Sequence, residues 1–248
     1  MSGVSVWSVV LAMSATVWGS VIRADRLRAT AESRQHRIAS DWSTAVVSGV
    51  VAIGVMIALG SRVDGPLPAI VIGVGVGGMI SQAMTDLCVH RLPLRVSHLT
   101  ALAILALGVF DAAMNADAVL ADAVIAGVAG VIGGVSMAAV GLFVARLTRG
   151  SLGRGDVHFG LPLGALIGWW TSRVTGVGAA TGVEGPDAGT VDVGLNVVRN
   201  VVTAWGLTAV SAGVVVMALL LARRVDRSSH IPYGPFMVAG TLLALVST

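Results

Sequence analysis

Long apolar blocks, separated by shorter polar stretches, run along the whole chain. The blocks cover approximately residues 4–22, 44–60, 67–85, 96–114, 119–145, 157–173, 201–222 and 234–247. Most of them approach the roughly 20 apolar residues that an α-helix needs to cross a bilayer. The pattern therefore predicts an all-α fold, a polytopic transmembrane helix bundle of about eight helices.

Two segments between the blocks are long enough to need separate treatment. Residues 23–43 are polar with scattered apolar positions, which leaves open an interfacial helix or a solvated loop. Residues 175–195 are rich in Gly, Thr, Val and Asp, so we predict a flexible outer loop. We expect one integral-membrane domain over residues 1–248, with a core at about 67–248 and two N-terminal helices with a cytoplasmic loop at 1–66.

Composition agrees with a membrane protein. Of 248 residues, 55% are hydrophobic and only 12% are charged, whereas charged residues make up about 25% of an ordinary soluble domain. The net charge of +3 does not indicate nucleic acid as a partner, because the basic residues cluster in alternate loops. The single cysteine excludes an internal disulfide and a cysteine-based zinc site.

The distribution of arginine predicts the orientation. Alternate loops hold Arg23, Arg26, Arg28, Arg34, Arg37, Arg91, Arg95, Arg146, Arg149, Arg154, Arg223, Arg224 and Arg227. The other loops hold only Arg62, Arg173 and Arg199. By the positive-inside rule, the arginine-rich loops are cytoplasmic and both termini lie outside. We expect a multi-pass protein of the cytoplasmic membrane, whose first block, residues 4–22, is an uncleaved helix because no basic segment precedes it.

Two aspartates stand where an apolar block meets an arginine-bearing loop on the predicted cytoplasmic side. Asp86 is followed by Leu-Pro at 92–93, and Asp156 ends a Gly-Arg-Gly-Asp stretch. Carboxylates at the edge of a bilayer are costly and commonly functional. Two carboxylates together can share one proton and activate water. We therefore expect Asp86 and Asp156 to form a catalytic pair.

Glycines 160, 164 and 168 follow Asp156 at intervals of four and share its face on a helix. Small residues at this spacing let another helix come close in lipid. Gly78, Gln82 and Asp86 have the same spacing, so we expect these two faces to cross and bring the carboxylates together. The alternative is that the glycines only pack helices and the aspartates are solvated charges at helix ends.

The residues just before Asp156 predict its local setting. Gly153 and Gly155 permit a sharp backbone turn into the following helix. Asp156 then lies near a helix N-terminus, where the helix dipole favours its ionised form and nominates it as the more readily ionised carboxylate. Pro93 ends any helix that continues past Leu92.

Three histidines, His90, His98 and His158, lie near the aspartates in sequence. Their spacing matches no His-Glu-x-x-His arrangement, and no serine stands in a nucleophile elbow. We therefore predict no metal, no cofactor and no serine-type triad.

Three stretches resemble motifs of the type IV prepilin peptidase family, bacterial members of the GxGD membrane aspartyl proteases. Residues 86–93 resemble an Asp followed, after a short basic turn, by Ile/Leu-Pro, and residues 153–157 match Gly-x-Gly-Asp-Val. Residues 231–236, Ile-Pro-Tyr-Gly-Pro-Phe, resemble a hydrophobic-Pro-aromatic-Gly-Pro-Phe motif near the family's C-terminus. The likeness covers about residues 67–248 and keeps the family's order of motifs.

The resemblance implies an aspartic endopeptidase that cleaves leader peptides from type IV prepilin-like precursors at the cytoplasmic membrane face. It implies Asp86 and Asp156 as the catalytic dyad, with a prepilin-like protein and the lipid bilayer as partners. The residues that would support the motifs are Pro93, Gly153, Gly155, Pro232, Gly234 and Pro235.

The chain departs from the family at two positions: Leu94 replaces a polar residue, and His158 stands where Lys is usual. Residues 23–43 contain no Cys, unlike the cysteine-rich region that larger members use for N-methylation, so we expect no N-methyltransferase activity.

Two other functions stay open. Presenilin-like or signal-peptide-peptidase-like proteases share Gly-x-Gly-Asp but carry Tyr-Asp, whereas Thr85 precedes Asp86 here. A proton-coupled small-solute transporter could relay protons through aspartates, but both aspartates face one side of the membrane.

Overall fold

The computed structural model describes residues 65–89, 94–115, 119–147, 152–175, 186–222 and 232–248, with residues 50, 51, 54, 55, 57–59, 63 and 92. Its labelled helices are α3 (Pro66–Val89), α4 (Leu94–Asn115), α5 (Val119–Leu147), α6 (Arg154–Val174), α7 (Pro186–Leu221) and α8 (Gly234–Ser247). Residues 50, 51, 54, 55 and 57–59 are also helical, and the described residues include no strand. The all-α prediction is confirmed for this part of the chain. The predicted count of eight helices is wrong for it, and the predicted span at 4–22 lies outside the described residues.

Five of the labelled helices begin and end within four residues of a predicted block; α7 does not. It starts at Pro186 rather than near residue 201, so the predicted outer loop at 175–195 is wrong for residues 186–195. Proline suits the first position of a helix, where its fixed φ is already helical and its missing N–H is not needed. Val193 and Val197 then pack against Ala129 of α5, which holds this added helical length on the bundle.

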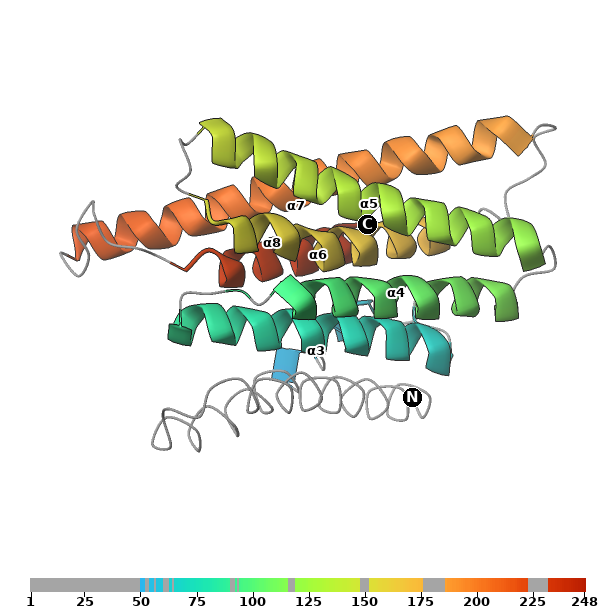
Figure 1. The fold of residues 1–248 in the computed structure, drawn as a ribbon, viewed down its shortest axis with the longest axis horizontal. Coiled ribbons are helices and arrows are strands. Elements are labelled where there is room, and N and C mark those ends of the chain that lie inside the picture. Colours follow the sequence, from blue (N-terminus) through green and yellow to red (C-terminus); the bar gives the residue numbers. More distant parts are fainter. Residues whose placement is uncertain are drawn as a thin grey trace.

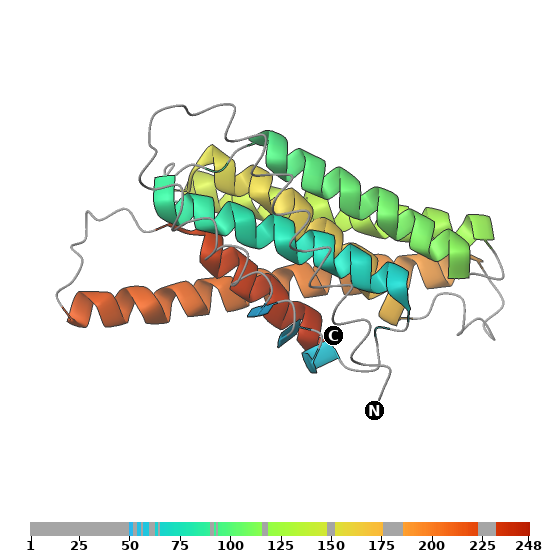
Figure 2. The same ribbon diagram turned by 90° about the horizontal axis from the view of Figure 1, so that it is seen from below.

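Helix α6 is the centre of the bundle. Figure 1 shows α6 and α8 in the middle, with α5 and α7 on one side and α4 and α3 on the other. Helix α6 contacts each of the other five labelled helices, and almost every residue between Phe159 and Ser172 is buried. Seen from below in Figure 2, α8 crosses the longer α7 at an angle.

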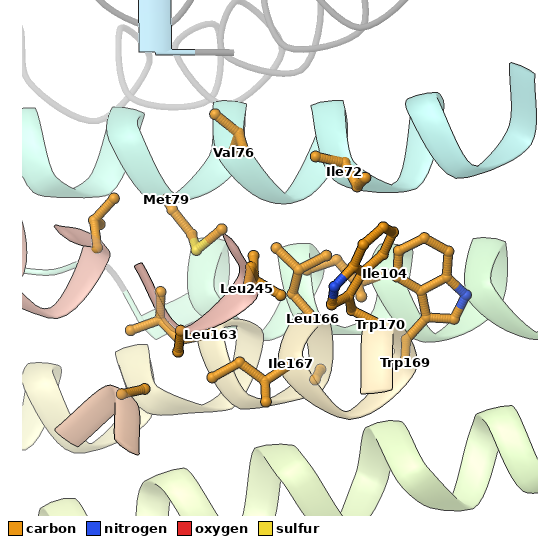
Figure 3. Close-up of a cluster of buried hydrophobic side chains, with 14 of the residues drawn as sticks. Ile72, Val76, Met79, Ile104, Leu163, Leu166, Ile167, Trp169, Trp170 and Leu245 are labelled. Atoms are coloured by element: carbon orange, nitrogen blue, oxygen red, sulfur yellow. The ribbon is translucent and has the colours of Figure 1, made fainter. Parts of the chain in front are cut away.

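Large apolar side chains from four helices meet in the core that Figure 3 shows. They include Ile72, Val76 and Met79 of α3, Ile104 of α4, Leu163, Leu166, Ile167, Trp169 and Trp170 of α6, and Leu245 of α8. Because lipid tails are as apolar as these side chains, close van der Waals packing stabilises such a core inside a bilayer.

The glycine stripe of α6 packs against α5. A Cβ at Gly164 would overlap the backbone of Gly133, and a Cβ at Gly168 would overlap the backbone of Ala129. A Cβ at Gly160 would lie 3.2 Å from backbone atoms of α5. The predicted crossing of this stripe with the helix that carries Asp86 is therefore wrong. Glycine spacing predicts a close approach but not the partner, and α5 brings a glycine of its own to the contact.

The outside of the bundle is apolar. Four helical stretches are long and apolar enough to cross a membrane, namely Pro66–Asp86, Leu94–Met114, Leu120–Leu147 and Asp192–Leu219. The first is 83% buried inside the protein, but only 28% of the last is, and α7 exposes Val202, Val210 and Leu221. An apolar exterior of this extent suits lipid rather than water. Helix α6 lies outside this set of four, and its predicted block at 157–173 is a helix enclosed by the others.

Candidate active site

Asp86 lies in the last turn of α3 and contacts the first residue of α8. Its side chain is 6% exposed. Its Oδ2 atom accepts a hydrogen bond from the backbone N–H of Gly234 at 3.0 Å. Gly234 begins α8 directly after its N-cap residue, Tyr233, and an N–H at a helix N-terminus is a natural donor to a carboxylate. This contact joins the first and third of the three motifs.

Asp156 is the third residue of α6 and caps its own helix. Its Oδ2 atom accepts a hydrogen bond from the backbone N–H of Gly153 at 3.0 Å, and its N–H donates to the carbonyl of Gly153 at 3.1 Å. This reciprocal pair satisfies donors that a helix N-terminus would otherwise leave open.

The charges of the two aspartates act on each other. Burial, and then the negative charge of Asp86, raise the pKa of Asp156 from 3.8 to about 6, and the hydrogen bond from Gly153 opposes the change. The dipole argument predicted that the ionised form of Asp156 is favoured, and its raised pKa contradicts that prediction. Burial and a second negative charge outweigh one N–H donor at a helix N-terminus.

Three motif glycines stand where a side chain would disturb the aspartates or the loop beside them. A Cβ at Gly155 would lie 2.9 Å from the Cβ of Leu92, which belongs to the first motif. A Cβ at Gly234 would lie 3.1 Å from Oδ2 of Asp86, and one at Gly153 would lie 3.2 Å from Oδ2 of Asp156. Glycine is needed at these positions because the backbone itself approaches its neighbours.

The prolines of the motifs fall at the edge of the site. Pro235 lies in the first turn of α8, where proline is favoured, and Pro232 immediately precedes the N-cap residue. Pro93 lies outside the described residues.

An aromatic group borders the aspartates, and sequence reasoning missed its member on α7. Tyr233 stacks on Trp205 with ring centroids 6.3 Å apart and lies 6.4 Å from the ring of Phe236. The indole N–H of Trp205 donates to the carbonyl of Met137 at 3.2 Å, which fixes this ring on α5. Burial, and then the charge of Asp156, raises the pKa of Tyr233. Trp205 belongs to none of the three motifs, so only the fold shows that it lies beside Tyr233.

A buried polar contact lies one helical turn from Asp86. The side chain of Gln82 donates to the carbonyl of Gly78 at 3.2 Å, and Ser97 of α4 donates to Oε1 of Gln82 at 2.5 Å. Gln82 and Ser97 are both fully buried. The contact ties α3 to α4 just below the carboxylate, since residues four apart lie on one helix face.

Two of the three histidines come together. Nε2 of His98 and Nδ1 of His158 are 3.2 Å apart, and His90 lies outside the described residues. No group of three or more His, Cys, Asp or Glu side chains with metal-binding geometry occurs within the described ranges.

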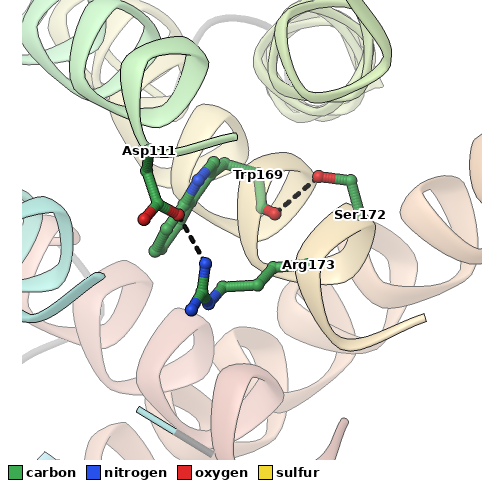
Figure 4. Close-up of polar contacts among 4 residues, drawn as sticks. All are labelled: Asp111, Trp169, Ser172 and Arg173. Carbon is green, nitrogen blue, oxygen red and sulfur yellow. Dashed lines mark hydrogen bonds and ion pairs between the residues drawn. The ribbon is translucent and has the colours of Figure 1, made fainter. Parts of the chain in front are cut away.

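The other end of α6 carries a buried ion pair that sequence reasoning also missed. Figure 4 shows Arg173 of α6 reaching Asp111 of α4; the guanidinium donates to Oδ2 at 2.6 Å, and the carboxylate is 1% exposed. Ser172 donates to the carbonyl of Trp169 beside it at 2.7 Å. Asp111 and Arg173 are 62 residues apart, so no local sequence pattern pairs them.

An apolar groove of about 730 Å³ lies between α4 and α5, away from both aspartates. Its lining includes Leu102, Val109, Leu120 and Val131, all on helices with apolar outer faces. We regard it as part of the lipid-facing surface, because it offers none of the polar groups that orient a substrate.

Comparison with known proteins found no matching family model, no matching curated protein and no matching solved structure.

Proposed function

We propose that this protein is a membrane aspartyl endopeptidase that cleaves the leader peptide of type IV prepilin-like precursors at the cytoplasmic membrane face. One observation carries the proposal. The three stretches that resemble prepilin peptidase motifs are far apart in sequence, yet they are in contact. Leu92 of the first lies against Gly155 of the second, and Asp86 of the first accepts a hydrogen bond from Gly234 of the third. A chance likeness of three separate stretches would give no reason for them to meet around two carboxylates.

The electrostatics support a division of labour within the pair. Asp156, with its raised pKa of about 6, holds the proton that the two carboxylates share and donates a hydrogen bond to the scissile carbonyl oxygen. Asp86, whose negative charge the Gly234 N–H stabilises, accepts a proton from the attacking water. That proton then passes to the leaving amine as the tetrahedral intermediate collapses.

The cytoplasmic position rests on the arginine distribution. Asp86 and Asp156 adjoin the loops after α3 and before α6, both of which belong to the arginine-rich set. A substrate anchored by an apolar helix would present its leader at this end of the bundle.

The test is cleavage of a co-expressed prepilin by Asp86→Asn and Asp156→Asn variants, followed as a mobility shift on immunoblots. We expect each substitution to lower the cleavage rate at least about a thousandfold, because the members of a catalytic unit fail together. Asp192→Asn is the matched control, since Asp192 is an exposed carboxylate on α7, and it should cleave like the wild type.

The variants are compared at equal levels in the membrane fraction. Processing at the wild-type rate by either aspartate variant would exclude the aspartyl mechanism. Processing of no prepilin-like substrate by the wild type would exclude the proposed substrate.

A further inference from the structure

His98 and His158 form a pair of imidazoles between two helices, outside the contacts assigned to the carboxylates. Each is the fifth residue of its helix, α4 and α6 respectively. The rings are T-shaped, with centroids 5.2 Å apart and planes at 86°. His98 is exposed and His158 is half-buried, so water and small ions reach the pair from outside the bundle.

The separation of the two facing nitrogens suits a transition metal. Zinc binds imidazole nitrogen at about 2.0–2.1 Å. With Nε2 of His98 and Nδ1 of His158 3.2 Å apart, one zinc ion bound to both would have an N–Zn–N angle of about 100°, close to tetrahedral. Small rotations of the exposed His98 ring and the half-buried His158 ring would then direct both lone pairs at the ion.

The contact between the rings also permits binding. One ring nitrogen donates its N–H to the other across the 3.2 Å contact. A metal ion can replace that hydrogen, with the donating ring keeping its proton on its other nitrogen. Because the described residues hold no third His, Cys, Asp or Glu beside the pair, water completes the coordination on the exposed side.

We infer that His98 and His158 form a binding site for Zn²⁺ that clamps the second turns of α4 and α6. Nitrogen ligands select zinc and similar transition metals over calcium and magnesium. The exposed arginines Arg95 and Arg154 lie about one helical turn before His98 and His158 on the same helices. Solvent screens their repulsion of the metal. The site goes beyond the proposed function, and its test does not depend on cleavage.

The test measures Zn²⁺ binding by the purified full-length chain, carrying an affinity tag without histidine, in competition with a chromophoric chelator. The decisive variant is His98→Gln with His158→Asn, because these amides place hydrogen-bonding atoms near Nε2 and Nδ1 but bind zinc poorly. We expect each single change to weaken binding at least about tenfold, or 1.4 kcal/mol, and the double change to remove it. Asp192→Asn, which changes an exposed carboxylate on α7, is the matched control and should bind like the wild type.

Thermal unfolding supplies a second measurement. A ligand that binds only the folded protein raises the midpoint of unfolding as its concentration rises. Added Zn²⁺ should therefore raise the midpoint of the wild type and of Asp192→Asn, but not that of the double variant. Equal Zn²⁺ binding by the wild type and the double variant, or no binding by the wild type, would overturn the inference.

Discussion

The two ends of α6 hold buried or half-buried carboxylates in opposite electrical settings. At the far end, Asp111 is 1% exposed and lies 2.6 Å from the guanidinium of Arg173. At the near end, Asp156 shares its surroundings with a second carboxylate, Asp86, and its pKa rises to about 6. An acid paired with a base is held in one state, whereas two acids that compete for a proton are poised to exchange it. The comparison shows that charge environment, not burial alone, separates a structural carboxylate from a candidate catalytic one.

The two ends also differ in what holds them together. The far end depends on side chains, with Trp169 packed over Gly108 beside the ion pair. The near end depends on backbone that approaches closely at Gly153, Gly155 and Gly234. Loss of the ion pair at the far end should reduce stability, whereas a Cβ added at the near end should displace the groups around the aspartates. The predictions below separate these two kinds of failure.

The largest expected effect on stability is at the ion pair. Asp111→Ala removes the buried carboxylate that pairs with Arg173 and should lower the free energy of unfolding by about 3–5 kcal/mol. The measurement is thermal or denaturant unfolding of the purified protein. Replacing both partners with apolar residues of similar size, Asp111→Leu with Arg173→Met, should restore most of the loss. If Asp111→Ala is as stable as the wild type, the pair does not stabilise this end.

A smaller effect, confined to activity, is expected at Gly155. In Gly155→Ala the new Cβ would lie 2.9 Å from Leu92, so the loop after Asp86 must move. A displacement of about 1 Å near reacting groups can lower a rate roughly a hundredfold. We expect cleavage to fall by about tenfold to a hundredfold, while the unfolding midpoint changes by no more than a few degrees.

Gly206→Ala provides the control for that variant. Nothing lies within 4 Å of a Cβ at Gly206, so the added methyl meets no neighbour. Cleavage should be unchanged, and the helix should gain up to about 1 kcal/mol because alanine is the better helix former. Equal rates for Gly155→Ala and Gly206→Ala would show that the loop contact does not position the carboxylates.

The hydrophobic pattern predicted most helices because a buried or lipid-facing helix must be apolar over its length. It placed α8 at its observed bounds, Gly234–Ser247, and α5 within two residues. It failed at the start of α7, where the polar, glycine-containing stretch after Pro186 forms helix. Contacts of Val193 and Val197 with α5 stabilise this stretch, and local composition does not encode such tertiary contacts.

Only part of the site could be predicted from the sequence, for a similar reason. The three motifs identified Asp86, Asp156 and Gly234, because the residues next to each of them form a recognisable pattern. Trp205 has none, and its role beside Tyr233 depends on how α7 crosses α8. The ionisation preference of Asp156 also depends on three-dimensional surroundings, since the desolvation that raises its pKa cannot be read from its neighbours in sequence.

The second-largest loss of stability is expected where the glycine stripe of α6 meets α5. A Cβ at Gly164 would overlap the backbone of Gly133, and backbone cannot turn aside as a side chain can. Gly164→Ala should therefore lower the free energy of unfolding by about 1–3 kcal/mol through overpacking. Unfolding of the purified variant, with Gly206→Ala again as the open-position control, measures this. If Gly164→Ala gains stability like Gly206→Ala, the two helices are not in backbone contact there.

The smallest effect, and the one that most sharpens the contrast between the two ends, is the pH dependence of stability at Asp156. Its pKa is raised in the folded state, from 3.8 to about 6, so the folded protein holds this proton more tightly than the unfolded chain. The associated stability is complete below about pH 4 and is lost as the pH rises through about 6.

Asp156→Asn removes the titrating group and keeps an oxygen that can accept the Gly153 N–H. At pH 8 this variant should therefore be more stable than the wild type, although we expect it not to cleave. Because Asp156 is partly exposed, solvent reduces the gain to about 1 kcal/mol, or roughly 2–4 °C in the midpoint. At pH 4 most of the advantage should be gone, because the folded wild-type carboxyl is then protonated and the unfolded one is close to its own pKa of 3.8. Midpoints recorded from pH 4 to 8 for Asp156→Asn, the wild type and the exposed control Asp192→Asn test this directly.

Asp111→Asn should instead be less stable than the wild type throughout this pH range, since it weakens the attraction to Arg173. A wild type that gains stability over Asp156→Asn as the pH rises would reverse the sign, and Asp156 would then be a structural carboxylate like Asp111.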